Sequence, residues 1–177
     1  MPLPTPSAQL PTQSELCALL DYNPETGVIT WKVTRGPAMA GRTAGRIQTG
    51  GYRQIKVGEK FLMEHRVIWA MTYGAWPRDQ IDHINSVRDD NRLINLREAT
   101  GSQNQQNHRR AHKHSASGLL GAHFHKREGN WRAVIRVDRK QKHLGRFASA
   151  ELAHAAYMKA KATLHPFQTI IAGEAQS

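Results

Sequence analysis

The sequence contains a single cysteine, Cys17, and no long apolar run. One cysteine cannot form an internal disulfide or supply the paired thiolates of a structural zinc site, so we expect no structural zinc. No segment approaches the roughly 20 apolar residues that a membrane helix needs. Residues 1–13 also lack the basic start and apolar centre of a signal peptide. We therefore expect no membrane contact and a cytoplasmic location.

Acidic residues are few, with 14 Asp and Glu against 25 Lys and Arg in 177 residues and a formal net charge of +11. The excess is uneven, because residues 1–100 carry 12 basic and 10 acidic residues while residues 101–177 carry 13 and 4. Eight of the ten histidines also lie in residues 101–177. A basic half next to a balanced half favours a polyanionic partner, most simply nucleic acid. The alternative is a basic protein whose charge serves only solubility.

The pattern along the chain predicts an α+β fold with two small domains. We expect a flexible tail over 1–13, a first domain over 14–110, a basic linker over 111–117, a second domain over 118–168 and a tail over 169–177. In the first domain, apolar spacing, caps and turn residues predict helices and strands alternately. They are a helix from Thr12, a strand over 28–31, a hairpin over 52–63, a helix over 65–73, short strands over 81–84 and 93–96, and a helix over 100–110.

The second domain has the pattern of a sheet followed by a helix. Trp131, Ala133 and Ile135 alternate with more polar residues, which indicates a strand with one buried face. A third strand is expected over 140–147, where a bulge at Gly145 would let Leu144 and Phe147 both face the core. Ser149 is expected to cap a helix that has an alanine-rich apolar stripe.

A polar stretch between Asp82 and Asn107 contains the residue types of a hydrolytic site. The Asp82 carboxylate can bind a hard cation while the adjacent imidazole of His83 takes a proton from water. Asn95 follows His83 by twelve residues, and if residues 93–96 fold back, its amide oxygen can accept a hydrogen bond from the imidazole. Asn104, nine residues further, is a candidate second metal ligand.

These residues, with several flanking pieces, resemble the HNH homing-endonuclease-like family over residues 21–107. The matching pieces are Tyr22–Val28, Gly51–Arg53, His65–Trp69, Ile81–Asn85, Asp90–Arg92, Asn95–Arg97 and Gln103–Asn104. The resemblance implies a ββα-metal nuclease fold in which Asp82 and Asn104 bind one divalent ion, His83 is the general base and Asn95 orients it. Asn104 stands where the family name has its second histidine, which makes the chain an HNN variant.

The function implied by this resemblance is metal-dependent hydrolysis of DNA phosphodiester bonds, by nicking or by double-strand cleavage. Mg²⁺ is the expected ion, with Mn²⁺ as the alternative, and the products would be a 5′-phosphate and a 3′-hydroxyl. A homing role and a phage DNA-processing role both fit, so the expected compartment is the cytoplasm of a bacterium or of a phage-infected host cell.

Other polar residues of the first domain receive less specific interpretations. Arg53 and Arg97 are expected to contact DNA. His65 opens a helix, which favours capping or packing over a phosphate contact. Asn91 is interpreted as a turn residue, and Asp90 as a residue that stabilises the loop rather than a metal ligand.

Residues 117–167 resemble the AP2/ERF-type DNA-binding domain. The matching pieces are Gly121–His123, Asn130–Ile135, His143–Phe147, Ala150–Tyr157 and Ala160. The resemblance implies a three-stranded antiparallel sheet on one helix, with the exposed sheet face in the major groove. The DNA-binding residues predicted on that face and at its edge are His123, His125, Lys126, Arg127, Arg132, Arg136, Gln141 and His143.

Two further functions are weighed against a nuclease. One is a DNA-binding regulator whose nuclease unit is inactive, although the intact His83 argues against a decayed site. The other is an RNA-binding protein, which would expose aromatic stacking platforms; the aromatic residues Trp131, Phe147 and Tyr157 are instead predicted to face the core. We expect double-stranded DNA as the partner, with no protein partner and a monomeric chain.

Overall fold

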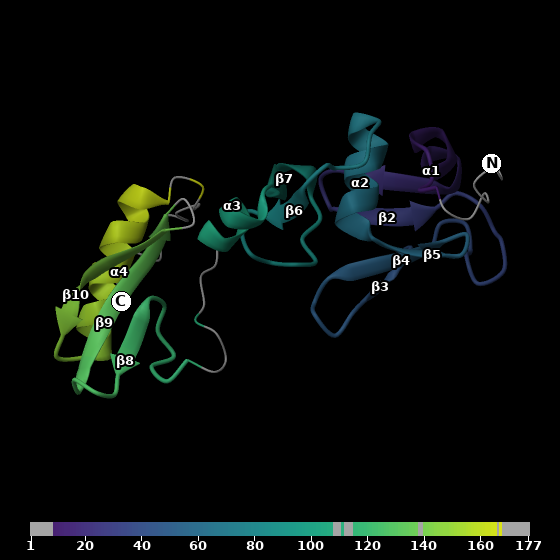
Figure 1. Ribbon diagram of the computed structural model, residues 1–177. Coiled ribbons are helices and arrows are strands. Elements are labelled where there is room, and N and C mark those ends of the chain that lie inside the picture. The colour runs from purple at the N-terminus through teal and green to yellow at the C-terminus, as the bar shows by residue number, and fades with distance from the viewer. Residues whose placement is uncertain (1–8, 108–110, 112–114, 138–139, 166, 168–177) are drawn as a thin grey trace, which may run out of the picture. The chain divides into compact units, whose positions relative to one another are not determined.

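The computed structural model describes residues 9–107, 111, 115–137, 140–165 and 167. The chain forms two compact units, residues 1–98 and 99–177, and the division falls before the domain boundary predicted at 110–111. The sheets are small and antiparallel and are combined with helices (Figure 1), so the predicted mixture of helices and strands is confirmed. Residues 1–8 of the predicted N-terminal tail, residues 112–114 of the predicted linker and the whole predicted C-terminal tail lie outside the described residues. No helix within the described ranges is long and apolar enough to cross a membrane.

The first unit begins with helix α1 and a hairpin of two short strands. Helix α1 (Gln13–Leu19) starts at the predicted capping box, in which Thr12 and Glu15 bond to each other's backbone N–H. Strand β1 (Leu20–Asn23), which the sequence pattern did not predict, pairs antiparallel with β2 (Val28–Trp31). The turn between them contains Gly27 at a φ of +75°, a conformation that favours glycine.

A three-stranded sheet in the order β3–β4–β5 and helix α2 complete the core of this unit. The strands are β3 (Arg46–Ile47), β4 (Arg53–Val57) and β5 (Lys60–Met63), and α2 (Glu64–Tyr73) follows β5 directly. Gly74, at a φ of +77°, ends α2 as predicted. The core consists of residues from both helices and all these layers, chiefly Leu16, Leu20, Ile29, Ile55, Val67 and Ile68.

Strands β6 (Gln80–His83) and β7 (Leu96–Ala99) pair with each other and are joined by a polar loop. The strand predicted over 93–96 is wrong, because Leu93–Asn95 form a short 3₁₀ turn and the strand starts only at Leu96. Helix α3 (Gly101–Gln106) belongs to the second unit. It begins at a capping box of Thr100 and Gln103.

The second unit contains a three-stranded antiparallel sheet and helix α4 (Ala150–Leu164), which packs on one face of the sheet (Figure 1). The strands, in the order β10–β9–β8, are β8 (Ala122–His125), β9 (Asn130–Val137) and β10 (Lys140–Phe147). The pairing of β9 and β10 shifts between His143 and Gly145, which confirms the predicted bulge. Leu144 and Phe147 both contact the small core of Ala122, Ala133, Ala150 and Ala153, as predicted.

Candidate active site

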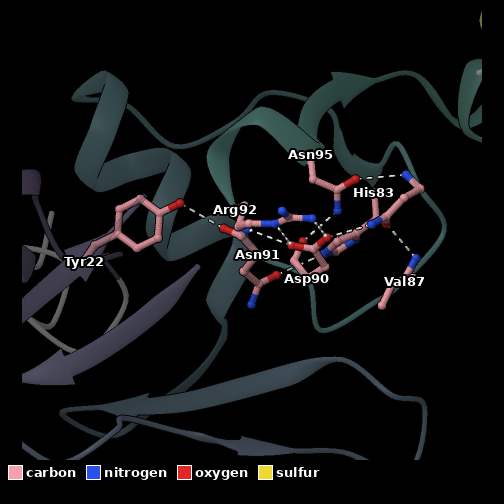
Figure 2. Close-up of polar contacts among 8 residues, drawn as sticks. Tyr22, His83, Val87, Asp90, Asn91, Arg92 and Asn95 are labelled. Atoms are coloured by element: carbon pink, nitrogen blue, oxygen red, sulfur yellow. Dashed lines mark hydrogen bonds and ion pairs between the residues drawn. The ribbon is translucent and has the colours of Figure 1, made fainter. Parts of the chain in front are cut away.

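The loop between β6 and β7 is fastened to the end of β6 by the side chain of Asn95 (Figure 2). Its Oδ1 accepts a hydrogen bond from the backbone N–H of Asn85 at 2.9 Å, and its Nδ2 donates to the backbone carbonyl of Asp90 at 2.7 Å. Asn95 is 5% exposed, so these bonds are shielded from water. The side-chain amide of Asn95, at the end of the loop, therefore holds both the start and the middle of the loop.

Asp90 holds the same loop from within. Its carboxylate accepts hydrogen bonds from Asn85 Nδ2 at 2.6 Å and from Arg92 Nε and Nη2 at 2.8 and 2.6 Å. The hydrogen bonds with Arg92, more than any other effect, lower the pKa of Asp90 to about 2. The structure confirms the loop-stabilising interpretation of Asp90.

His83, the predicted general base, lies at the end of β6 and is 4% exposed. Its Nε2 lies 3.0 Å from Oδ1 of Asn91 (Figure 2). The expected contact between His83 and Asn95 is therefore wrong in this structure, because the amide of Asn95 is used by the loop backbone. The interpretation of Asn91 as an ordinary turn residue is also wrong, since the hydrogen bond to His83 is made by its side chain.

Asn91 is completely buried and, besides His83, contacts residues of two other segments. Its backbone carbonyl accepts a hydrogen bond from the hydroxyl of Tyr22 on β1 at 2.9 Å. Its Nδ2 donates to Oε2 of Glu64, the first residue of α2, at 3.4 Å. Glu64 is also completely buried, and its Oε2 accepts a shorter hydrogen bond of 2.8 Å from Nε of Arg53 on β4.

Asp82, the predicted metal ligand, precedes His83 on β6 and is 6% exposed. Its Oδ2 accepts hydrogen bonds from Nε and Nη2 of Arg97, on β7, at 3.0 and 2.9 Å. Arg97 therefore neutralises the carboxylate at the strand pair. In this structure both Arg97 and Arg53, the two arginines expected to contact DNA, form ion pairs with buried carboxylates, and their side chains are 23% and 21% exposed.

Two more side chains surround His83 with aromatic rings. His65, the second residue of α2, meets His83 edge to face with 5.1 Å between ring centroids. The ring of Tyr52 contacts both histidines, at 5.5 and 5.8 Å. The guanidinium of Arg88, on the loop, lies 5.0 Å from the centre of the Tyr52 ring. His65 is thus buried and packed against the catalytic candidate, which confirms the packing role considered from the sequence.

Burial controls the charge state of the groups in this cluster. It lowers the pKa of His83, although the hydrogen bond with Asn91 and the nearby carboxylates oppose the shift. Burial, with smaller contributions from His83 and Arg66, lowers the pKa of His65 to about 3. Burial also raises the pKa of Glu64 against the opposing effect of Arg53. Both imidazoles are therefore neutral at pH 7, which is the state in which a histidine accepts a proton.

Residues 63–106, which contain this whole cluster except Tyr22, Tyr52 and Arg53, match the model of the HNH endonuclease family. Over this stretch the chain is similar to HNH endonucleases, which supports an HNH-type nuclease. A solved structure reported for DNA binding and cleavage by the HNH homing endonuclease I-HmuI is 19% identical, with 88% of each chain covered and a TM-score of 0.38. No curated protein matches the chain.

Within residues 63–106, the structure brings Asp82 and His83 together on β6 and places Asn95 at the base of the same loop. Asn104, the other predicted metal ligand, lies half-buried on α3, and its role stays a prediction. No group of three or more His, Cys, Asp and Glu side chains among the described residues is arranged to hold a metal ion. A metal site made of Asp82 and Asn104 would contain only one side chain of these four types, so it would not be such a group.

The predicted DNA-binding face of the second unit lies on one side of its sheet. His123 pairs with Arg132, Val134 with His143, and Arg136 with Gln141 across the strands, so these side chains share a face. The opposite face carries the buried residues Ala133 and Ile135. The two remaining basic residues at the end of β8, Lys126 and Arg127, are exposed, and His125 is half-buried.

Arg146 is a residue of this face that the sequence analysis missed. It pairs with Arg132 in the sheet register, and both guanidinium groups contact the carboxylate of Glu128, at 3.0 and 2.8 Å. The bulge at Gly145 shifts the alternation of β10 and so turns Arg146 to this face. The signal in the sequence for Arg146 is therefore Gly145, because a bulge there changes which face the later residues of the strand occupy.

Proposed function

We propose that this chain is a metal-dependent DNA endonuclease that hydrolyses phosphodiester bonds, and that its second unit is a DNA-binding module of the AP2/ERF type. The observation that carries the proposal is the buried His83, which is hydrogen-bonded to Asn91 and stands next to the carboxylate of Asp82. A neutral imidazole in a fixed orientation is suited to take a proton from water.

In this mechanism His83 removes a proton from the attacking water, and Asn95 and Asp90 keep the loop that follows it in place. The cluster of His65 and Tyr52 limits the access of bulk water to one side of the imidazole. The products are a 5′-phosphate and a 3′-hydroxyl. Cleavage of one or both strands, in homing or in phage DNA processing, is compatible with this chemistry.

The donor chemistry fits a hard divalent ion, with Mg²⁺ preferred and Mn²⁺ as the alternative. Asp82 supplies a buried carboxylate beside the base, and Asn104 would supply a neutral amide oxygen. When bound, such an ion stabilises the negative charge that develops on the phosphate and on the leaving oxygen. In this structure Arg97 forms an ion pair with Asp82.

The sheet and α4 of the second unit would direct the HNH residues to duplex DNA. Its exposed sheet face carries Arg132, Arg136 and Arg146, and guanidinium groups can bridge guanine edges or phosphates. The imbalance of 13 basic against 4 acidic residues over residues 101–177 supports this role. Arg53 and Arg97 would contact DNA only if their ion pairs with Glu64 and Asp82 open.

The deciding experiment compares wild type and His83→Ala on supercoiled plasmid with and without Mg²⁺. We expect wild type to nick the plasmid only with the metal, and the variant to bind DNA equally well but to lose at least about 100-fold in cleavage rate. Equal cleavage by both proteins would remove His83 from the chemistry. Tight DNA binding by wild type without cleavage in any divalent ion would favour the inactive regulator instead.

A further inference from the structure

Four side chains form a hydrogen-bonded chain that runs from β4 to the catalytic candidate. Nε of Arg53 donates to Oε2 of Glu64 at 2.8 Å, Nδ2 of Asn91 donates to the same oxygen at 3.4 Å, and Oδ1 of Asn91 lies 3.0 Å from Nε2 of His83. Glu64 and Asn91 are 0% exposed and His83 is 4% exposed. Water therefore does not compete for these contacts, and their donors and acceptors must match.

The direction of every hydrogen bond in this chain follows from its first member. A guanidinium has only donors, so Oε2 of Glu64 is an acceptor. The amide nitrogen of Asn91 must then face Glu64, which leaves its oxygen facing His83. An amide oxygen only accepts, so Nε2 of His83 must carry a proton.

This direction does not depend on the charge of Glu64. If the carboxyl group is protonated, the proton belongs on Oε1, because Oε2 is occupied by two donors. Oε1 is buried without a hydrogen-bond partner among the residues that the structure describes. The donors and acceptors of these hydrogen bonds are therefore the same whether Glu64 is protonated or ionised.

We propose that Asn91 and Glu64 are positioning residues that hold neutral His83 as its Nε2-protonated tautomer, so that Nδ1 carries the lone pair that acts as the base. This inference rests on the proposed nuclease function. The proton of the attacking water moves to Nδ1 as the water oxygen bonds to phosphorus. The bond from phosphorus to the 3′ oxygen breaks, and that oxygen takes a proton from solvent. The imidazolium still donates from Nε2 to Asn91, so the new charge is stabilised without rearrangement.

The tautomer can be measured directly by long-range ¹H–¹⁵N NMR on the full chain labelled with ¹⁵N-histidine, at about pH 8, above the ordinary histidine pKa. The spectrum of His83→Gln identifies the His83 signals among those of ten histidines. We expect the Nε2–H tautomer in wild type, and a large share of the Nδ1–H tautomer in Asn91→Leu. Tyr22→Phe is the matched control, because it removes a hydrogen bond from the Asn91 backbone and leaves its side chain in place.

Glu64 gives a second pair of variants. Glu64→Gln can keep an oxygen toward Arg53 and Asn91 and should retain the Nε2–H tautomer, whereas Glu64→Leu should release Asn91 and mix the tautomers. In plasmid nicking, Asn91→Leu should lower kcat by about tenfold or more, with the KM for DNA nearly unchanged, because orientation of the base affects the chemical step.

The outcomes separate this inference from the proposed function. An Nδ1–H tautomer in wild type, or a pure Nε2–H tautomer in both Asn91→Leu and Glu64→Leu, would overturn it whether or not the protein cleaves DNA. If the leucine variants do not fold, the tautomer of His83 in the wild-type protein still tests the proposal. A wild type that never cleaves DNA but has the Nε2–H tautomer would refute the nuclease and leave the positioning arrangement intact.

Discussion

The carboxylate of Asp82 and the guanidinium of Arg97 are joined by two hydrogen bonds, of 3.0 and 2.9 Å, that end on the same oxygen. The pair links β6 to β7, and the carboxylate is 6% exposed. A buried carboxylate needs a positive partner. Arg97 and a divalent ion would both supply positive charge to Asp82, so each weakens the need for the other.

Arg97→Met should reveal this exchange. The variant removes the guanidinium group that pairs with the buried carboxylate of Asp82, so we expect a loss of about 1–3 kcal/mol in the free energy of unfolding. Mg²⁺ should then raise the melting temperature of the variant more than that of wild type, because binding to the folded state is stabilising. The measurement is differential scanning fluorimetry across a Mg²⁺ titration. Equal metal responses of the two proteins would argue against Asp82 as a ligand.

Gly27→Ala should disturb the site from a distance. A Cβ at Gly27 would lie 2.5 Å from the backbone N of Arg92 and 2.7 Å from the backbone C of Asn91, so the loop that holds Asn91 must move. Gly58→Ala is the matched control, since Gly58 has a similar positive φ of +60° but open space around it. We expect both variants to lose about 1 kcal/mol from the backbone conformation, and Gly27→Ala to lose more and to nick plasmid more slowly.

Urea unfolding of the two glycine variants, followed by nicking assays well below the transition, separates stability from activity. Equal unfolding free energies for Gly27→Ala and Gly58→Ala would mean that the β1–β2 turn does not support the active-site loop.

His65 should make the stability of the first unit depend on pH. Its pKa falls from 6.5 to about 3 on folding, so between these values the unfolded chain binds a proton that the folded chain does not. Stability is then fully present above pH 6.5 and declines as the pH falls, by at most about 1.4 kcal/mol per unit for one proton. His65→Phe keeps a buried ring and should flatten the profile between pH 6.5 and 4. The control is His143→Gln, which removes an exposed histidine. If His65→Phe has the same dependence of stability on pH as wild type, the prediction is wrong.

Local signals in the sequence predicted much of the fold. The capping box at Thr12, the stop at Gly74 and the alternation around Ala133 each depend on neighbouring residues, and the structure confirms all three. Strand β1 escaped prediction although its burial alternates, because the alternation covers only four residues and follows directly on helix α1. The bulge at Gly145 was predicted, but its effect on the direction of Arg146 was not drawn from it.

The site was harder to predict than the fold, because its contacts join residues far apart in the chain. The spacing of twelve residues suggested that Asn95 would reach His83, but a nearer asparagine, Asn91, makes that contact. Nothing local marks Asn91, since its role depends on Glu64, 27 residues earlier, and on Tyr22, 69 residues earlier. A buried polar side chain is recognised only when the segments that bury it are known.

The identity of the metal can be tested at Asn104. An amide oxygen is a hard ligand that suits Mg²⁺, whereas an imidazole suits borderline ions such as Mn²⁺, Ni²⁺ and Zn²⁺ better. Asn104→Ala should lose most cleavage at limiting Mg²⁺, and Asn104→His should keep part of it with the ion preference moved away from Mg²⁺. Plasmid nicking across a series of divalent ions measures both. Wild-type cleavage by Asn104→Ala at limiting Mg²⁺ would show that Asn104 is not a ligand.

The DNA-binding face of the second unit can be tested by the salt dependence of binding. A fragment over residues 115–170 contains the three-stranded sheet and α4 with their own core, so it should fold alone and bind duplex DNA. Arg136→Ala should weaken binding by about 1–3 kcal/mol if the arginine contacts a base edge, and affinity should fall steeply with salt as counterions are released.

Lys159→Ala is the control, because Lys159 is exposed on α4, which covers the opposite face of the sheet. The two variants should therefore differ in fluorescence-anisotropy titrations at several salt concentrations. Equal losses would mean that charge alone, rather than this face, attracts DNA, and a folded fragment without affinity at low salt would exclude the module from DNA binding.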